Sequence, residues 1–181
     1  MLHYCLVHMA YHLSRWLPKH QRLKFQIITA IFVMLVLAPQ LYVLTRPKSS
    51  RYCQQPLLNN LACFIMLSLV ATGFAVVFTL LDPVPQAFKA AFHVFGVVSF
   101  AEGLCTTVLT ATATTCAKTT PELYYMSYLL TWACVLTTAF FLVMGGFWVS
   151  NTLHPGWALD RYSQSGVCYE PVHSWSCLWH V

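Results

Sequence analysis

The chain has 181 residues, of which 58% are hydrophobic and 8% are charged, and its mean hydropathy is +0.62. A soluble domain carries about 25% charged residues, and a chain this short must still cover its surface with polar groups, so the composition excludes an ordinary soluble domain. The formal net charge is +5, but no Lys/Arg block is interleaved with aromatic residues, which argues against nucleic acid as a partner. The expected surroundings are a lipid bilayer.

Residues 1–24 form a basic segment before the first apolar run. Polar and basic side chains recur in it at helical spacing: His8, His12, Arg15, Lys19 and Arg22. This pattern is typical of a basic amphipathic helix lying on the membrane surface. Pro18 interrupts the pattern, so a disordered terminus is the other interpretation.

The first two apolar runs each predict a membrane-spanning helix. Residues 25–45 and 57–81 carry no charged side chain, and about 20 residues are enough to cross the hydrocarbon core. Pro39 lies inside the first run, where its missing N–H predicts a kink. Asp82 and the prolines that follow it end the second run.

The third predicted span, residues 90–117, is the most polar. Glu102 lies near its middle, and six threonines occupy its second half. Small residues recur at fourfold spacing, among them Ser99, Gly103 and Thr107, which favours close helix packing. A partly inserted or re-entrant segment is the other interpretation of these residues.

Glu102 is the candidate functional residue of this run, together with Thr106 and Thr110, which follow one and two turns later. A carboxylate at mid-membrane depth is costly unless it is protonated, paired or exposed to water, so it is a candidate ion or proton site. The competing interpretation is a neutral carboxyl group hydrogen-bonded to nearby threonines. No other acidic residue lies within a predicted span, and a proton relay normally uses several such groups, which favours the second interpretation.

Residues 123–150 form the last predicted span, with aromatic residues near both ends, as is typical of interfacial belts. The tail, residues 151–181, is polar and aromatic and too short for a stable domain. Its four potential zinc ligands alternate in type and leave little chain for a tetrahedral cage: Cys168, His173, Cys177 and His180. We therefore expect no metal site. The sequence also lacks the motifs of nucleophilic catalysis and phosphate binding that would predict an enzyme or a cofactor.

Four spans place both termini on the same side of the membrane. That side receives six of the ten Lys and Arg residues and the opposite side receives four. The charge distribution therefore favours cytosolic termini, in the plasma membrane or an endomembrane.

One stretch of the last span resembles a known family. Phe141–Ser150 reads FLVMGGFWVS and is followed by Pro155 and by Cys168 and Tyr169. It is similar to a late span of the transmembrane protein 272-like family, which are small multi-span proteins in which a Gly-x-x-Trp-Val segment precedes a loop with a cysteine.

Cys53 and Pro56 likewise resemble the first external loop of that family, although the family has no counterpart of residues 90–117. The resemblance implies that Cys53 and Cys168 share the external side, where they could form a disulfide. A four-span topology places them on opposite sides, so the two expectations exclude each other. The family has no established activity that would imply a function here.

The sequence favours an interaction, scaffold or accessory subunit that packs against other membrane helices or further copies of itself. It has little soluble mass and few ionisable groups within the spans. The alternative is a channel or transporter component in which Glu102 and the threonines line a polar path. A membrane enzyme ranks third, because only the tail clusters polar groups.

Overall fold

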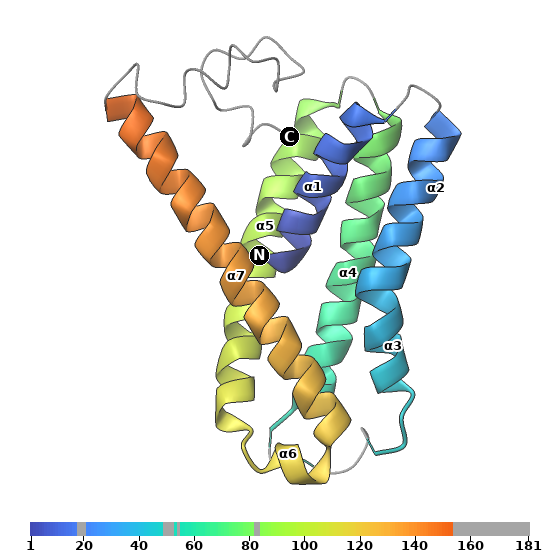
Figure 1. Cartoon of the computed structure of the whole chain (residues 1–181), viewed down its shortest axis with the longest axis vertical. Helices are drawn as coiled ribbons and strands as arrows, with labels where there is room; N and C mark the ends of the chain where they lie inside the picture. The colour runs from blue at the N-terminus through green and yellow to red at the C-terminus, as the bar shows by residue number, and fades with distance from the viewer. Residues whose placement is uncertain (18–20, 49–52, 54, 82–83, 154–181) are drawn as a thin grey trace. The chain divides into compact units, whose positions relative to one another are not determined.

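The computed structural model describes residues 1–17, 21–48, 53, 55–81 and 84–153, and this part of the chain is helical with no strand. It divides into two compact units, residues 1–137 and residues 138–181. The described part of the second unit is the end of the last helix. The elements in chain order are α1 (Leu2–Trp16), α2 (Gln21–Phe32), η1 (Val33–Leu37), α3 (Ala38–Leu44), α4 (Leu57–Leu80), α5 (Gln86–Thr112), α6 (Cys116–Thr119) and α7 (Pro121–Leu153) (Figure 1).

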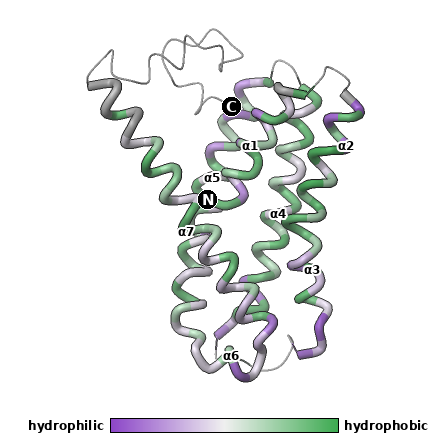
Figure 2. The backbone as a smooth tube through the Cα atoms, in the orientation of Figure 1, coloured by the Kyte–Doolittle hydropathy of each residue, from purple (hydrophilic) through white to green (hydrophobic). Residues whose placement is uncertain are grey.

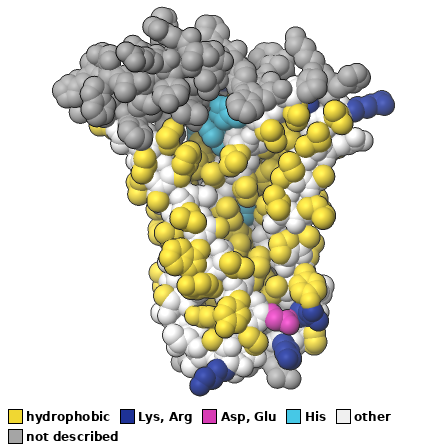
Figure 3. Space-filling view, viewed as in Figure 1, with side chains coloured by type: hydrophobic (Ala, Val, Ile, Leu, Met, Phe, Trp, Pro, Cys, Tyr) yellow, Lys and Arg dark blue, Asp and Glu magenta, His cyan; other side chains and the backbone are white. Residues whose placement is uncertain are grey.

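Four helical segments are long and apolar enough to cross a membrane, which confirms the predicted all-α fold with four spans. They are Arg22–Leu44, Leu57–Leu80, Gln86–Thr112 and Pro121–Gly146. Figure 2 shows these helices as mostly hydrophobic along their length, with hydrophilic residues gathered toward helix ends and connections. Hydrophobic side chains likewise cover much of the visible face, and Lys and Arg side chains cluster near the α6 end (Figure 3). The chain is therefore an integral membrane protein.

The third span differs in its bounds from the predicted residues 90–117. It begins at Gln86, directly after Pro85, whose fixed φ favours a helix start although Lys89 then lies within the first turn. It ends at Thr112, whose hydroxyl oxygen donates to the carbonyls of Val108 (3.0 Å) and Leu109 (3.1 Å). Lys89 and Lys118, which flank the predicted span, therefore do not mark the ends of the helix.

A π-helical turn, η1, lies next to Pro39 in the first span. The backbone N–H of Ala38 donates to the carbonyl of Val33, five residues earlier. Pro39 has no N–H for an ordinary helical bond, and a wider turn just before it relieves the crowding of its ring against the preceding turn. The wider turn also changes which side chains face inward: Gln40, only 1% exposed, points into the bundle.

Helix α1 packs against α4 and α5, so residues 2–16 form an ordered helix and not a disordered terminus. The buried face holds His3, Tyr4, Val7, His8, Ala10, Tyr11 and Ser14, whereas Met9 and Leu13 point outward. His8 thus faces the bundle interior together with apolar residues such as Val7 and Ala10. Exposed apolar side chains such as Met9 are expected where the surroundings are lipid.

The interior between α1, α4 and α5 is aromatic at one end of the bundle. The ring of Tyr4 stacks on Phe92 with centroids 4.4 Å apart, and Phe78 meets Phe92 edge to face at 5.1 Å. Tyr11 contacts Phe78 at 5.9 Å. These contacts orient α1 parallel to α4 and antiparallel to α5.

Candidate functional site

A network of buried polar side chains joins α1, α3, α4 and α5 at the middle of the bundle. His3 lies between two serines: its Nε2 atom is 2.9 Å from Ser68 Oγ, and its Nδ1 atom is 3.4 Å from Ser99 Oγ. Gln40 Nε2 donates to Ser68 Oγ at 3.3 Å. All four side chains are at most 2% exposed. Ser99 is the middle residue of α5, so the network lies halfway along a span.

A neutral His3 side chain gives every hydrogen bond of this network a donor and an acceptor. Ser68 Oγ donates to the Phe64 carbonyl (2.9 Å), so it accepts from both Gln40 and His3. His3 therefore carries its hydrogen on Nε2, and Nδ1 accepts from Ser99. Ser99 Oγ in turn accepts from the amino nitrogen of Met1 at 3.0 Å. The imidazole is neutral in this arrangement, which suits a site shielded from water.

One acceptor of the network has no partner among the described residues. Gln40 Oε1 is buried and makes no hydrogen bond there. A buried carbonyl oxygen without a donor costs about 1–3 kcal/mol, so the site is able to accept one further hydrogen bond. Its chemistry suits a small donor, such as a water molecule or a hydroxyl group.

A second polar contact joins α4 to α5 further along the bundle. Asn60 Nδ2 donates to Thr106 Oγ1 at 2.9 Å, and both side chains are buried. Thr106 Oγ1 donates in turn to the backbone carbonyl of Glu102 (2.9 Å). Asn60 lies in the first turn of α4.

The three residues of the predicted polar site lie on one helix but do not converge. Thr106 and Thr110 are buried, whereas Glu102 is half-buried. Thr110 Oγ1 accepts from Thr131 of α7 at 3.3 Å. The carboxyl atom Glu102 Oε1 is buried and has no hydrogen-bond partner in the described part of the chain, so neither threonine bonds to that atom.

The three predicted packing residues also lie on α5. Ser99 belongs to the polar network, and Thr107 Oγ1 donates to the carbonyl of Gly103 (2.8 Å) within the same helix. A Cβ atom on Gly103 would lie 3.2 Å from Cys134 Sγ of α7, so glycine permits close approach of α5 and α7 at this point.

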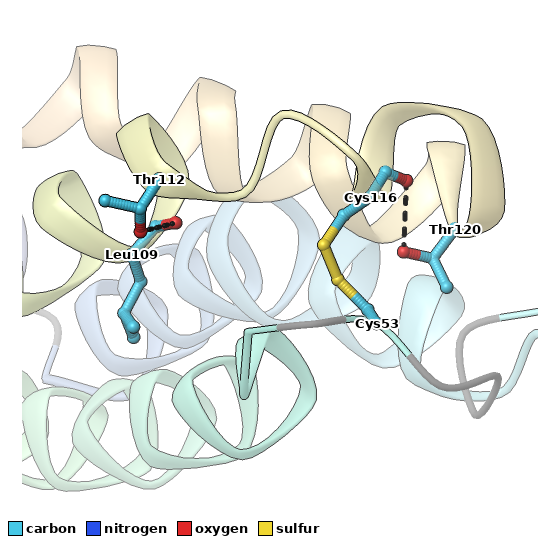
Figure 4. The surroundings of a disulfide bond; sticks show 5 residues. All are labelled: Cys53, Leu109, Thr112, Cys116 and Thr120. Atoms are coloured by element: carbon cyan, nitrogen blue, oxygen red, sulfur yellow. Dashed lines mark hydrogen bonds between the residues drawn. A yellow bond between two sulfur atoms is a disulfide. The ribbon is translucent and has the colours of Figure 1, made fainter.

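A disulfide joins Cys53, in the connection before α4, to Cys116, the first residue of α6 (Figure 4). Their Cα atoms are 5.4 Å apart, within the usual range for disulfides. The implied Cys53–Cys168 disulfide is therefore wrong in this structure, because Cys53 is bonded elsewhere. Cys168 and the other potential zinc ligands lie outside the described residues, as does the tail from residue 154 onward.

Polar contacts at the same end of the bundle connect the first span to α7. Arg46 Nε lies 3.7 Å from Glu122 Oε2, and the Arg46 guanidinium carbon is 4.4 Å from the centroid of the Tyr42 ring. Because both charged side chains are well exposed, the ion pair contributes little to stability.

Sequence reasoning missed His3, Gln40, Ser68 and Asn60. Gln40 could have been found in principle. It is the only amide side chain between Pro39 and the end of the apolar run 25–45, where a polar group needs a hydrogen-bond partner. His3 has a weaker signal: Tyr4, Val7 and Tyr11 continue its helical face, but the same segment also has an apolar face that competes for the interior.

Comparison with protein-family models, with curated protein sequences and with solved structures found no match. The resemblance to the transmembrane protein 272-like family therefore stays a prediction.

Proposed function

We propose that this integral membrane protein is an interaction or accessory subunit that binds partner membrane helices through α7. The observation that supports this proposal is the division of α7 into two stripes. Leu123, Ser127, Leu130 and Cys134 are buried, whereas a second stripe at the same spacing is exposed: Tyr125, Leu129, Trp132 and Leu136. Of the four spans, α7 has the smallest buried share, 17% against 33–39%.

The length of α7 supports the same role. With 33 residues it extends about 50 Å at 1.5 Å per residue. The hydrocarbon core is about 30 Å thick, and a helix longer than the core tilts or kinks, a mismatch that also drives some helix–helix association. Association through the exposed stripe would cover its large aromatic and leucine side chains.

Site-specific photo-crosslinking in native membranes tests the proposal. A photoreactive residue at Leu129 or Leu136 is expected to give a discrete protein adduct, and differently tagged copies of the chain show whether the partner is a second copy. Met66 and Leu69, exposed residues of α4, are the matched control positions. Lipid adducts alone at all four positions would contradict the proposal.

The second candidate is a channel or transporter component. It is favoured by Glu102 Oε1, which has no hydrogen-bond partner among the described residues. Glu102 lies on α5, a helix whose buried residues include Ser99, Thr106 and Thr110. The variant Glu102→Gln keeps the shape and removes the charge. Normal expression with altered ion or proton flux in proteoliposomes would support transport, whereas unchanged flux would leave α5 with a packing role.

We further propose that the α6 end of the bundle faces the lumen or the cell exterior and that the opposite end faces the cytosol. Disulfides form and persist in oxidising compartments, and Cys53 and Cys116 both lie at the α6 end. The count of Lys and Arg residues favours the same orientation.

A glycosylation reporter tests this orientation, because the chain contains no Asn-x-Ser or Asn-x-Thr acceptor of its own. A Gly/Ser segment with one acceptor, inserted between α3 and α4, is expected to be glycosylated. The same segment inserted between α4 and α5 is expected to remain unmodified, and the reverse result would invert the topology.

A further inference from the structure

His8 and His12 lie on successive turns of α1, and their imidazole rings face each other. The Nε2 atoms of the two rings are 3.3 Å apart. The ring planes are tilted by 70°, with centroids 4.7 Å apart. When both rings are neutral, the N–H at one Nε2 atom donates to the lone pair of the other. A metal ion bound by two histidines requires the same approach of two ring nitrogens.

The distance between the two nitrogen atoms matches the separation that a tetrahedral metal ion imposes on its ligands. Histidine nitrogens bind zinc at about 2.0–2.1 Å, so two of them at the tetrahedral angle are about 3.3–3.4 Å apart. The 3.3 Å between His8 Nε2 and His12 Nε2 therefore allows chelation without movement of the α1 backbone. The ring that donates the hydrogen bond transfers its hydrogen to Nδ1 when metal binds, so both Nε2 lone pairs become available and no proton is released.

The pair lies level with the start of α5, near the membrane surface. Tyr4 contacts His93, which is about 10 Å into α5 from Gln86. Because α1 runs antiparallel to α5, His8 and His12 lie about 6 and 12 Å back toward that start. With 27 residues, α5 extends about 40 Å, so its ends lie outside the roughly 30 Å hydrocarbon core. His12 is partly exposed, which gives an ion a route from water to the pair.

We propose that His8 and His12 form a metal site that binds one Zn²⁺ ion or another first-row divalent transition metal. Imidazole suits these ions, whereas Mg²⁺ and Ca²⁺ take oxygen ligands. Within the described ranges, no third His, Cys, Asp or Glu side chain joins the pair, so water molecules complete the coordination. With only two protein ligands, the ion is exchangeable. This inference goes beyond the partner-binding role proposed for α7 and does not rest on it.

A titration with Co²⁺ tests the site, because tetrahedral Co²⁺ absorbs visible light far more strongly than the hydrated ion. The full chain is purified in detergent without a histidine tag. The histidines and cysteines outside the described residues are replaced by alanine to exclude other ligands: His20, His154, Cys168, His173, Cys177 and His180. We expect a visible absorption that Zn²⁺ abolishes and Mg²⁺ does not. Absence of this absorption would overturn the proposal, whatever the variants below show.

Substitution of one ligand locates the binding. Zn²⁺ bound to the folded state raises the unfolding temperature. His12→Asn is expected to need at least about ten times more Zn²⁺ for the same rise, because one imidazole cannot chelate the ion. His93→Asn is the matched control, since His93 is an exposed histidine outside the pair, and it is expected to respond like the parent protein. An equal response of His12→Asn and the parent protein would mean an adventitious ion only.

A gain of signal protects the test against a folding defect in His12→Asn. His12→Cys replaces the imidazole by a thiolate, which also binds zinc and cobalt. It is expected to add a sulfur-to-cobalt charge-transfer band in the near ultraviolet, which the parent protein lacks. The unfolding temperature in EDTA confirms that each variant is folded. Folded His12→Cys without this band would overturn the assignment of His12 as a ligand.

Discussion

Asn60 and Thr106 form a direct hydrogen bond of 2.9 Å between α4 and α5, two helices that a membrane would otherwise hold together mainly by packing. Both side chains are buried, and the Thr106 hydroxyl group donates a hydrogen bond to the backbone carbonyl of Glu102 in α5. The bond therefore fixes the position of α4 relative to α5 along their axes.

A double-mutant cycle measures this bond. Asn60→Ala and Thr106→Val are each expected to destabilise the protein, with a coupling free energy of about 0.6 kcal/mol, the average for such pairs in membrane helices. Unfolding of the purified protein in mixed detergent micelles gives the four free energies. Strictly additive effects of the two substitutions would show that the bond is not formed.

Gln40→Met is expected to be neutral or to stabilise the protein by up to about 1 kcal/mol, because it removes the unpartnered Oε1 atom and loses one long hydrogen bond. Ser68→Ala is the contrasting change. It leaves both His3 and Gln40 without their acceptor, so we expect it to be clearly destabilising in the same unfolding experiment. A large loss of stability in Gln40→Met would mean that Oε1 is hydrogen-bonded in the membrane.

Cys53→Ser and Cys116→Ser are each expected to release one new thiol, because the two cysteines are bonded to each other. Alkylation with a polyethylene glycol maleimide, before and after reduction, counts thiols by gel shift. Cys63→Ser is the control. Cys63 is a free cysteine, so its loss is expected to lower by one the number of thiols that react before the disulfide is reduced. We expect loss of the disulfide to lower the free energy of unfolding by on the order of 2 kcal/mol. The effect stays at this level because helices that remain inserted in the membrane already restrict the unfolded chain, which leaves less for the disulfide to restrict.

Gly103→Ala is expected to cost about 1 kcal/mol through its contact with Cys134, whose sulfur must move by a few tenths of an ångström. Shortening the opposing side chain in Gly103→Ala/Cys134→Ala is expected to restore stability. Gly73→Ala, where the added methyl group meets nothing, provides the baseline for the helix propensity of alanine. Equal stability of both single variants would show that α5 and α7 are not closely packed here.

The spans could be predicted because each coincides with a long apolar run that has few or no charged residues, and the chain has no other way to bury so many apolar residues. The bounds of α5 could not, since Lys89 lies inside the helix and the turn after Thr112 follows from local hydrogen bonds. The periodic pattern of residues 1–24 indicates a helix, but it does not show which face of that helix packs against other helices.

The polar network was beyond sequence reasoning for a different reason. His3, Ser68 and Ser99 come from three helices, and a single sequence carries no signal that pairs them. The same is true of the disulfide. Other cysteines lie at distances from Cys53 along the chain that are comparable with that of Cys116, and the sequence does not show which of them is bonded. Glu102, by contrast, was conspicuous in the sequence, but its buried oxygen atom Oε1 has no hydrogen-bond partner in the described part of the chain.

The position of α1 has a consequence for how the protein is made. His3 precedes Ser68 by 65 residues and Ser99 by 96, so α1 is synthesised before the parts of α4 and α5 against which it packs. Ribosomes add about 5–20 residues per second, so α1 waits roughly 5–20 s for α5. During that interval we expect it to lie at the cytosolic membrane surface as an amphipathic helix. Its final seat is then reached after insertion of the spans, as a late step of assembly.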